Sequence, residues 1–197
     1  NILKRLSDEY FVINDLLLKT SRGTTQIDHV VISKYGIFVI ETKNYTGWIY
    51  GGENAENWTK NVYGNKYSFR NPLKQNYAHI KALMEILGDS SSTVFIPIVA
   101  FSNQADIKVQ CSKEVINFYE LIRAISCYQQ ERLTDSEVQE YIRKLSNSTE
   151  YSKEEKKVQQ INKIMKITQS EESHSSISSL IEIENKNPGT ISKQTLE

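Results

Sequence analysis

Two apolar runs that meet at a short glycine turn constrain this chain more than any other feature. The runs cover residues 26–33 and 37–43. Apolar, β-branched runs of this length on either side of a glycine turn are typical of two antiparallel strands. Three ionisable residues, Asp28, Glu41 and Lys43, lie within the runs. Burying a charged group costs free energy unless it is paired or binds an ion, so this hairpin needs a polar site.

The pairing of the two runs can be counted from the turn. If Tyr35-Gly36 forms a two-residue loop, with the glycine supplying positive φ, Val30 faces Glu41 and Asp28 faces Lys43. Residues two apart in a strand share a face, so the three ionisable side chains lie on one side. A three-residue loop would place Asp28 on the other face unless a bulge corrected it. The two-residue turn therefore predicts that the three side chains converge.

Two acids and a lysine on one face are suited to phosphate chemistry. Like charges repel unless a cation lies between them, and carboxylate oxygens are the ligands that hard divalent cations prefer. A cation held in this way can direct water at a phosphate. The alternative interpretation is a pair of carboxylates on a solvated face of the hairpin.

The spacing Asp-x12-Glu-x-Lys resembles that of the PD-(D/E)xK superfamily of restriction-endonuclease-like phosphodiesterases. Three blocks in order, residues 23–31, 36–49 and 71–76, resemble the nuclease-related domain (NERD) family within it. The resemblance implies an α/β fold with a restriction-endonuclease-like core, in which helices flank a mixed twisted β-sheet.

The resemblance also implies a catalytic site of Asp28, Glu41, Lys43 and Gln75. Asp28 and Glu41, with the backbone carbonyl of Thr42, would bind Mg²⁺ or Mn²⁺. Lys43 would orient the attacking water and stabilise charge developing on the phosphate. Gln75 would line the site from the first turn of the next helix, unless it is only a polar surface residue. The implied activity is metal-dependent hydrolysis of phosphodiester bonds in DNA processing or repair.

A non-catalytic nucleic-acid-binding or regulatory domain on the same fold is the alternative. The presence of Asp28, Glu41 and Lys43 together favours the enzyme, since a degenerate domain need not retain all three. The chain carries 24 basic and 24 acidic residues. A nucleic acid, DNA rather than RNA, would therefore be held by a local patch and metal, because no broad positive field is present.

The remaining composition favours a cytoplasmic protein. Cys111 and Cys127 are the only cysteines, and their separation matches neither a zinc site nor a disulfide framework. This fragment has no apolar run long enough to span a membrane and no recognisable signal peptide.

The organisation of the sequence changes after residue 147. We expect a NERD nuclease-like domain over 1–147, a polar helix over 148–168, and a disordered serine-rich tail or linker over 169–197. In the first domain, strands are expected near 10–18, 26–33, 37–43, 48–50, 58–62, 66–69 and 94–101. Helices are expected over 72–87, 119–128 and 135–145.

Several single residues carry further expectations. Asn71 should cap the 72–87 helix, which Gly88 ends. Pro97 indicates an edge or bulged position in its strand. His79 suits a phosphate contact or a packed helix histidine, and His29 suits the core. The predicted buried stripe of the helix is Leu73, Tyr77, Ile80, Met84 and Leu87.

A cluster of aromatic residues follows the second apolar run. The simpler interpretation is a half-buried sheet surface. The alternative is a surface that stacks on unpaired bases, near Lys60, Lys66 and Arg70. The aromatic residues are Tyr45, Trp48, Tyr50, Trp58, Tyr63 and Tyr67.

Overall fold

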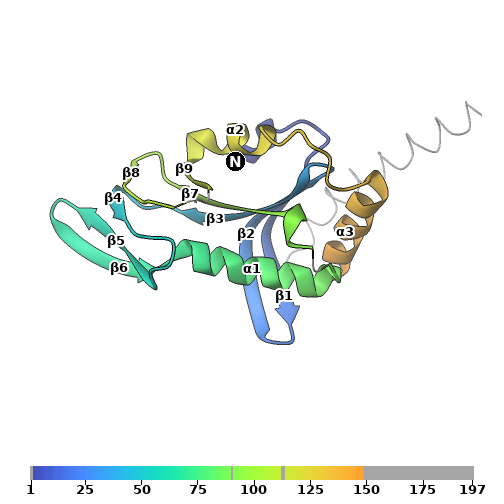
Figure 1. Cartoon of the computed structure of the whole chain (residues 1–197), viewed down its shortest axis with the longest axis horizontal. Coiled ribbons are helices and arrows are strands. Elements are labelled where there is room, and N and C mark those ends of the chain that lie inside the picture. The colour runs from blue at the N-terminus through green and yellow to red at the C-terminus, as the bar shows by residue number, and fades with distance from the viewer. Residues whose placement is uncertain (1, 90, 112–113, 149–197) are drawn as a thin grey trace, which may run out of the picture. The chain divides into compact units, whose positions relative to one another are not determined.

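The computed structural model describes residues 2–89, 91–111 and 114–148. These residues form an α/β fold with two mixed sheets, and Figure 1 shows their arrangement. The predicted fold class is therefore confirmed. The expected polar helix and serine-rich tail lie, apart from Ser148 at the end of the last described helix, outside the described residues.

The main sheet has the strand order β1-β2-β3-β7-β9. Its strands are β1 (Phe11–Thr20), β2 (Gly23–Ser33), β3 (Gly36–Lys43), β7 (Phe95–Phe101) and β9 (Glu114–Asn117). The first three are antiparallel neighbours, whereas β7 lies parallel to β3 and β9 lies parallel to β7. The long helix-containing connection between β3 and β7 permits this parallel addition, as the sequence predicts.

A second, smaller sheet has the strand order β6-β5-β4-β8. Its strands are β4 (Gly47–Tyr50), β5 (Asn57–Val62), β6 (Asn65–Arg70) and β8 (Ala105–Ile107). The predicted β5–β6 hairpin is present, with Tyr63 and Gly64 both at positive φ in the turn. The sequence does not predict β8 or β9, which are three and four residues long and, unlike β4, carry no aromatic residues that mark a strand.

Helices cover both faces of the main sheet. They are η1 (Ile2–Arg5), α1 (Pro72–Leu87), η2 (Ser92–Val94), η3 (Phe118–Glu120), α2 (Leu121–Ser126) and α3 (Asp135–Ser148). Helix α1 lies on one face, and α2 with η1 lies on the other (Figure 1). Leu3, Leu121 and Ile125 pack there against Phe38 and Ile40 of β3. The alternate β3 residues, including Glu41, consequently face α1. None of the described helices is long and apolar enough to cross a membrane.

The turn between β2 and β3 lies one residue earlier than predicted, which shifts the pairing of the two strands by two residues. Ser33 pairs with Gly36, so the loop residues are Lys34 and Tyr35. The ladder runs out to His29 opposite Ile40, so the next positions outward are Asp28 and Glu41. A shift of two residues leaves every side chain on its predicted face, because the strand period is two.

Gly36 explains why the turn lies earlier. Its φ is 139°, and a Cβ atom there would lie 2.8 Å from Ile96 Cδ1 and 2.9 Å from the Val94 carbonyl oxygen. The glycine therefore begins β3 and allows the chain before β7 to approach closely. A side chain at this position would have to displace backbone.

Helix α1 begins and ends as predicted, but its buried side is rotated. Asn71 Oδ1 accepts a hydrogen bond from the Leu73 N–H at 2.9 Å, and Gly88 ends the helix at φ 69°. Tyr77 of the predicted stripe is 60% exposed. The buried residues are Pro72, Asn76, His79, Ile80, Ala82, Leu83 and Leu87. Two of these are polar, and hydrophobic periodicity alone does not place polar residues inside.

Pro97 does not lie in an edge strand, but it lies at a position where the strand has a described neighbour on one side only. Strand β7 is internal, between β3 and β9. Its pairing with β9 begins only at Ile98, so Pro97 lies where β7 has no neighbour on that side. The missing N–H of proline therefore takes no hydrogen bond from the β7–β9 ladder.

Candidate functional site

A polar network lies at the carboxyl end of β3, beneath helix α1. Glu41 is only 2% exposed. The Lys43 ammonium donates to Glu41 Oε1 at 2.7 Å and to Gln75 Oε1 at 3.1 Å. Glu41 and Lys43 alternate onto the face that α1 covers, and Gln75 reaches them from the first turn of that helix. The structure thus brings three of the four predicted catalytic residues into direct contact.

Asp28 is tied to the same end of β3 through Thr42. The Thr42 backbone N–H and its hydroxyl both donate to Asp28 Oδ2, each at 2.7 Å. No described residue hydrogen-bonds to the other carboxylate oxygen, Oδ1. Because Thr42 lies between Glu41 and Lys43 in the chain, Asp28 belongs to this neighbourhood without contacting either through a hydrogen bond. The catalytic roles of these residues stay predictions.

His79 completes the surroundings of Glu41. Its Nε2 lies 3.1 Å from Glu41 Oε2, and its Nδ1 lies 3.0 Å from the Thr25 hydroxyl. The ring is 5% exposed, which fits the packed-histidine interpretation and leaves it inaccessible as a surface phosphate contact. With the proton on Nε2, His79 donates to Glu41 and accepts from Thr25. Both Glu41 oxygens therefore accept hydrogen bonds, one from a lysine and one from a histidine.

Asn76 is a site-supporting residue that the sequence reasoning missed. Its Nδ2 donates to the carbonyl oxygens of Val39 in β3 and Ile98 in β7, at 2.9 and 3.0 Å. The side chain is fully buried, and its Oδ1 has no hydrogen-bond partner among the described residues. This clamp holds α1 against the sheet one residue from Gln75 and three from His79. Two polar residues spaced i, i+3 on a packed helix are the sequence signal that could have indicated it.

His29 is half-buried and does not belong to the hydrophobic core. Its Nδ1 lies 2.8 Å from Asn14 Oδ1 on the neighbouring strand. Burial lowers the pKa of His29, although the nearby Asp28 and Asp15 act to raise it. The ring therefore favours its neutral form beside the network and does not add a positive charge to it.

The donor set suits a hard cation but is small. Among the described residues, no group of three or more His, Cys, Asp or Glu side chains forms a metal site. The predicted ligands, Asp28, Glu41 and the Thr42 carbonyl, do not make such a group even in ideal positions, because only two are side chains. They are all oxygen donors, which is the chemistry that Mg²⁺ and Mn²⁺ prefer.

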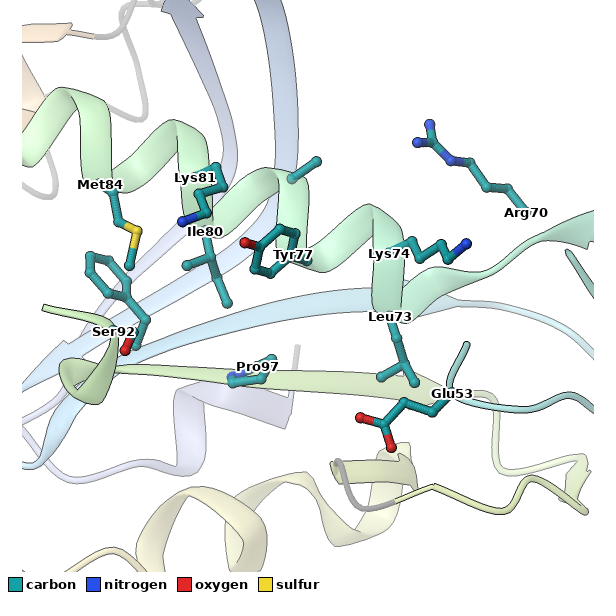
Figure 2. A pocket seen from close by; sticks show the side chains of 12 residues that line it. Glu53, Arg70, Leu73, Lys74, Tyr77, Ile80, Lys81, Met84, Ser92 and Pro97 are labelled. Atoms are coloured by element: carbon teal, nitrogen blue, oxygen red, sulfur yellow. The ribbon is translucent and has the colours of Figure 1, made fainter. Parts of the chain in front are cut away.

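The larger of two grooves beside α1 does not contain the network. It measures about 950 Å³ and lies between α1 and β7, where Figure 2 shows Leu73, Ile80 and Met84 pointing toward the strand that carries Pro97. Arg70, Lys74 and Lys81 add basic side chains along it. None of the predicted catalytic residues lines this groove.

A smaller groove touches the network on the other side of α1. It measures about 450 Å³, and its lining includes Thr25, the residue that bonds His79. Arg22 and Lys81 contribute positive charge to its walls, and Glu85 contributes one carboxylate. The Glu85 carboxylate accepts hydrogen bonds from the N–H and the hydroxyl of Ser21, which lies in the turn between β1 and β2.

Comparison with known proteins agrees with the resemblance. Residues 1–102, a little more than half of the chain, match the model of the nuclease-related domain family, NERD. An uncharacterized protein of Bacillus anthracis is 41% identical over 135 residues, which cover 66% of this chain and 63% of that protein. The chain thus spans less than two thirds of that relative. No solved structure matches this chain significantly. The chain therefore belongs to the nuclease-related domain family, within the PD-(D/E)xK superfamily.

Proposed function

We propose that the protein is a metal-dependent nuclease that hydrolyses phosphodiester bonds, of DNA rather than RNA, in DNA processing or repair. The observation that carries the proposal is the position of the Lys43 ammonium, which contacts both Glu41 and Gln75. Asp28 is held at the same strand end by Thr42. Membership of the nuclease-related family supports the reaction class.

Asp28 and Glu41, with the Thr42 carbonyl, would hold Mg²⁺ or Mn²⁺. When bound, such a cation polarises a phosphate oxygen and makes a coordinated water more acidic. In the structure the Lys43 ammonium neutralises Glu41 at 2.7 Å. A cation would therefore compete with Lys43 for Glu41 Oε1. Once the ion pair between Lys43 and Glu41 weakens, the Lys43 ammonium would be free to contact the phosphate.

The protein side chains would then position the reactants. Gln75 Oε1 accepts a hydrogen bond from the Lys43 ammonium and would hold it in position. The ammonium would then donate to the attacking water or to a phosphate oxygen. In hydrolysis the water oxygen bonds to phosphorus, the ester P–O bond breaks, and the departing oxygen takes up a proton. Lys43 would stabilise the negative charge that grows on the phosphate during this exchange.

One observation favours the alternative of a non-catalytic nucleic-acid-binding or regulatory domain. Glu41 is almost fully buried, and both of its oxygens already accept hydrogen bonds, from Lys43 and His79. A carboxylate whose oxygens are both hydrogen-bonded in this way is consistent with a purely structural role, in which Glu41 joins β3 to α1. Metal binding and turnover distinguish the two candidates.

The test uses the full chain with single- and double-stranded DNA in Mn²⁺, Mg²⁺ or EDTA. Glu41→Gln and Asp28→Asn should abolish both cleavage and the rise in melting temperature on adding metal, because they remove the ligand charge. Lys43→Met should retain the metal-induced rise while cleavage falls by about 100-fold or more, because its role lies in the transition state.

Lys34→Met is the matched control, since Lys34 is a partly exposed lysine paired with Glu131 at the β2–β3 turn. It should cleave at the parental rate. Cleavage that persists in EDTA, or a fully active Lys43→Met, would defeat the nuclease proposal. DNA binding without cleavage under every metal condition would establish the non-catalytic alternative.

A further inference from the structure

The smaller sheet exposes two aromatic rings in the middle of one face. Along β4, Ile49 is buried, whereas Trp48 and Tyr50 on either side of it are 51% and 40% exposed. Their ring centroids lie 6.4 Å apart at an interplanar angle of 85°. Strand β4 is paired on both sides, with β5 and with β8. The rings therefore stand on an ordered sheet surface, where apolar exposure costs free energy unless a ligand covers it.

The neighbours of these rings on the same face are polar or charged. Directly paired residues share a face, so Trp48 lies in a row with Asn61 of β5 and Lys66 of β6. Tyr50 lies in the adjacent row, with Thr59 and Ser68. These rows contain no aliphatic side chain. A protein partner would be expected to find aliphatic surface around the aromatic rings, and this face offers hydrogen-bonding groups and positive charge instead.

Positive charge gathers in this part of an otherwise neutral chain. Residues 57–84, which include β5, β6 and α1 as far as Met84, contain no aspartate or glutamate. The same segment carries five cations, Lys60, Lys66, Arg70, Lys74 and Lys81. Beyond Trp48 on the other side, the Asp106 carboxylate is paired with Lys108 at 2.9 Å. Of these cations, Lys66 and Arg70 lie on the face of Trp48 and Tyr50, because they alternate with Ser68 along β6, whereas Lys60 pairs with Ile49 on the opposite face. The positive charge of Lys66 and Arg70 suits a polyanion.

The Asn61 side chain, in the row of Trp48 and Lys66, has a buried oxygen without a hydrogen-bond donor in the part of the chain that the structure describes. Its Oδ1 is covered but accepts no hydrogen bond from any described residue. It lies between Trp48 and Lys66 in the same row. An N–H of a base or a sugar hydroxyl that reached this oxygen would supply the missing donor.

We propose that the face formed by Trp48, Tyr50, Asn61 and Lys66 binds unpaired nucleotides of a single-stranded nucleic acid. Bases would stack on the two rings, and Lys66 would contact the phosphates. The bases of a duplex stack on one another and cannot present their faces to the rings. This inference rests on the proposed nuclease function, because it names the form of substrate that reaches the site.

The two tryptophans provide a direct readout. Trp48 is half-exposed and Trp58 is 1% exposed, so quenching of intrinsic fluorescence by an oligonucleotide reports on Trp48 alone. The full chain is titrated in EDTA, which prevents metal-dependent cleavage, with a 20-residue oligothymidylate or a duplex of equal length. Saturable quenching by oligothymidylate, at least about fivefold tighter than by the duplex, is expected.

Variants assign the effect to this face. Tyr50→Ala should weaken oligothymidylate binding by about fivefold or more, as should Lys66→Glu at low salt. Tyr119→Ala, at an exposed aromatic on η3, is the matched control and should bind like the parent. Parental affinity in Tyr50→Ala, or equal quenching by duplex, would overturn the proposal. So would a Trp48 emission shift that depends on protein concentration without oligonucleotide, since a second copy would then cover the face.

These outcomes separate the inference from the nuclease proposal. Single-strand binding that is lost in Tyr50→Ala, without cleavage in any metal, supports this inference and removes the catalytic function. Metal-dependent cleavage with unaltered binding in Tyr50→Ala supports the nuclease and removes the stacking face.

Discussion

Glu41 is a buried carboxylate whose cost of burial is offset by two specific partners. Lys43 supplies the compensating charge from the same strand, two residues away, and His79 supplies a second donor from α1. Removing a partner from a buried charge costs more than an exposed ion pair gains, because the remaining group cannot turn to water. Each partner is therefore required for the network to stay closed.

The dependence on His79 can be measured by unfolding. His79→Ala should lower the free energy of unfolding in urea by about 1–3 kcal/mol, because it leaves Glu41 Oε2 and the Thr25 hydroxyl without their partner. Tyr77→Ala, two residues away on the exposed side of α1, should change it by less than about 1 kcal/mol. Equal losses in the two variants would show that helix packing alone, and not the hydrogen bonds, sets the effect.

The start of α1 is the element that aligns the candidate site. Asn71 is fully buried and acts in two directions. Its Oδ1 caps the helix at Leu73, and its Nδ2 donates to carbonyl oxygens in the loop before β5, including those of Glu53 and Ala55. The loop and the first turn are therefore held by one side chain, and Gln75 follows within that turn.

Substitutions at Asn71 should separate its two roles. Asn71→Ala should cost about 1–3 kcal/mol, because it removes the cap and leaves the loop carbonyls without donors. Asn71→Ser should recover about 1 kcal/mol of this, since serine can cap the helix but cannot replace the Nδ2 bonds. Chemical denaturation followed by circular dichroism measures both. A serine variant as stable as the parent would mean that the loop bonds contribute nothing to stability.

At the scale of the whole molecule, charge is segregated although it sums to zero. The acid-free segment 57–84 includes β5, β6 and the part of α1 that carries Gln75 and His79 of the polar network. A chain of this kind attracts a polyanion locally and lacks the general affinity of a basic protein. Binding of nucleic acid should therefore depend on salt through a few contacts only.

That dependence is open to titration at several sodium chloride concentrations. Each phosphate contact on a single strand contributes about 0.7 to the slope of log affinity against log salt. Lys66→Gln should reduce the slope by about 0.7, whereas Lys4→Gln, at an exposed lysine on η1, should leave it unchanged. A slope insensitive to Lys66 would place the phosphates elsewhere on the molecule.

The sequence by itself determined the features that depend on local chemistry. The cap at Asn71, the stop at Gly88 and the alternation of β2 and β3 each follow from a few neighbouring residues, and the structure has all of them. The spacing of Asp28, Glu41 and Lys43, with the family resemblance, indicated the residues around which the network forms. Period-two alternation kept these residues on their predicted face, because placing the turn one residue late shifts the strand pairing by two residues.

Only the tertiary structure decided what depends on distant partners. Gly36 begins β3 because the chain before β7, about sixty residues later in the sequence, passes against it. The buried side of α1 includes Asn76 and His79 because their partners come from β2, β3 and β7. Hydrophobic periodicity describes which residues prefer to leave water, whereas a polar residue is buried only where the fold supplies its hydrogen bonds.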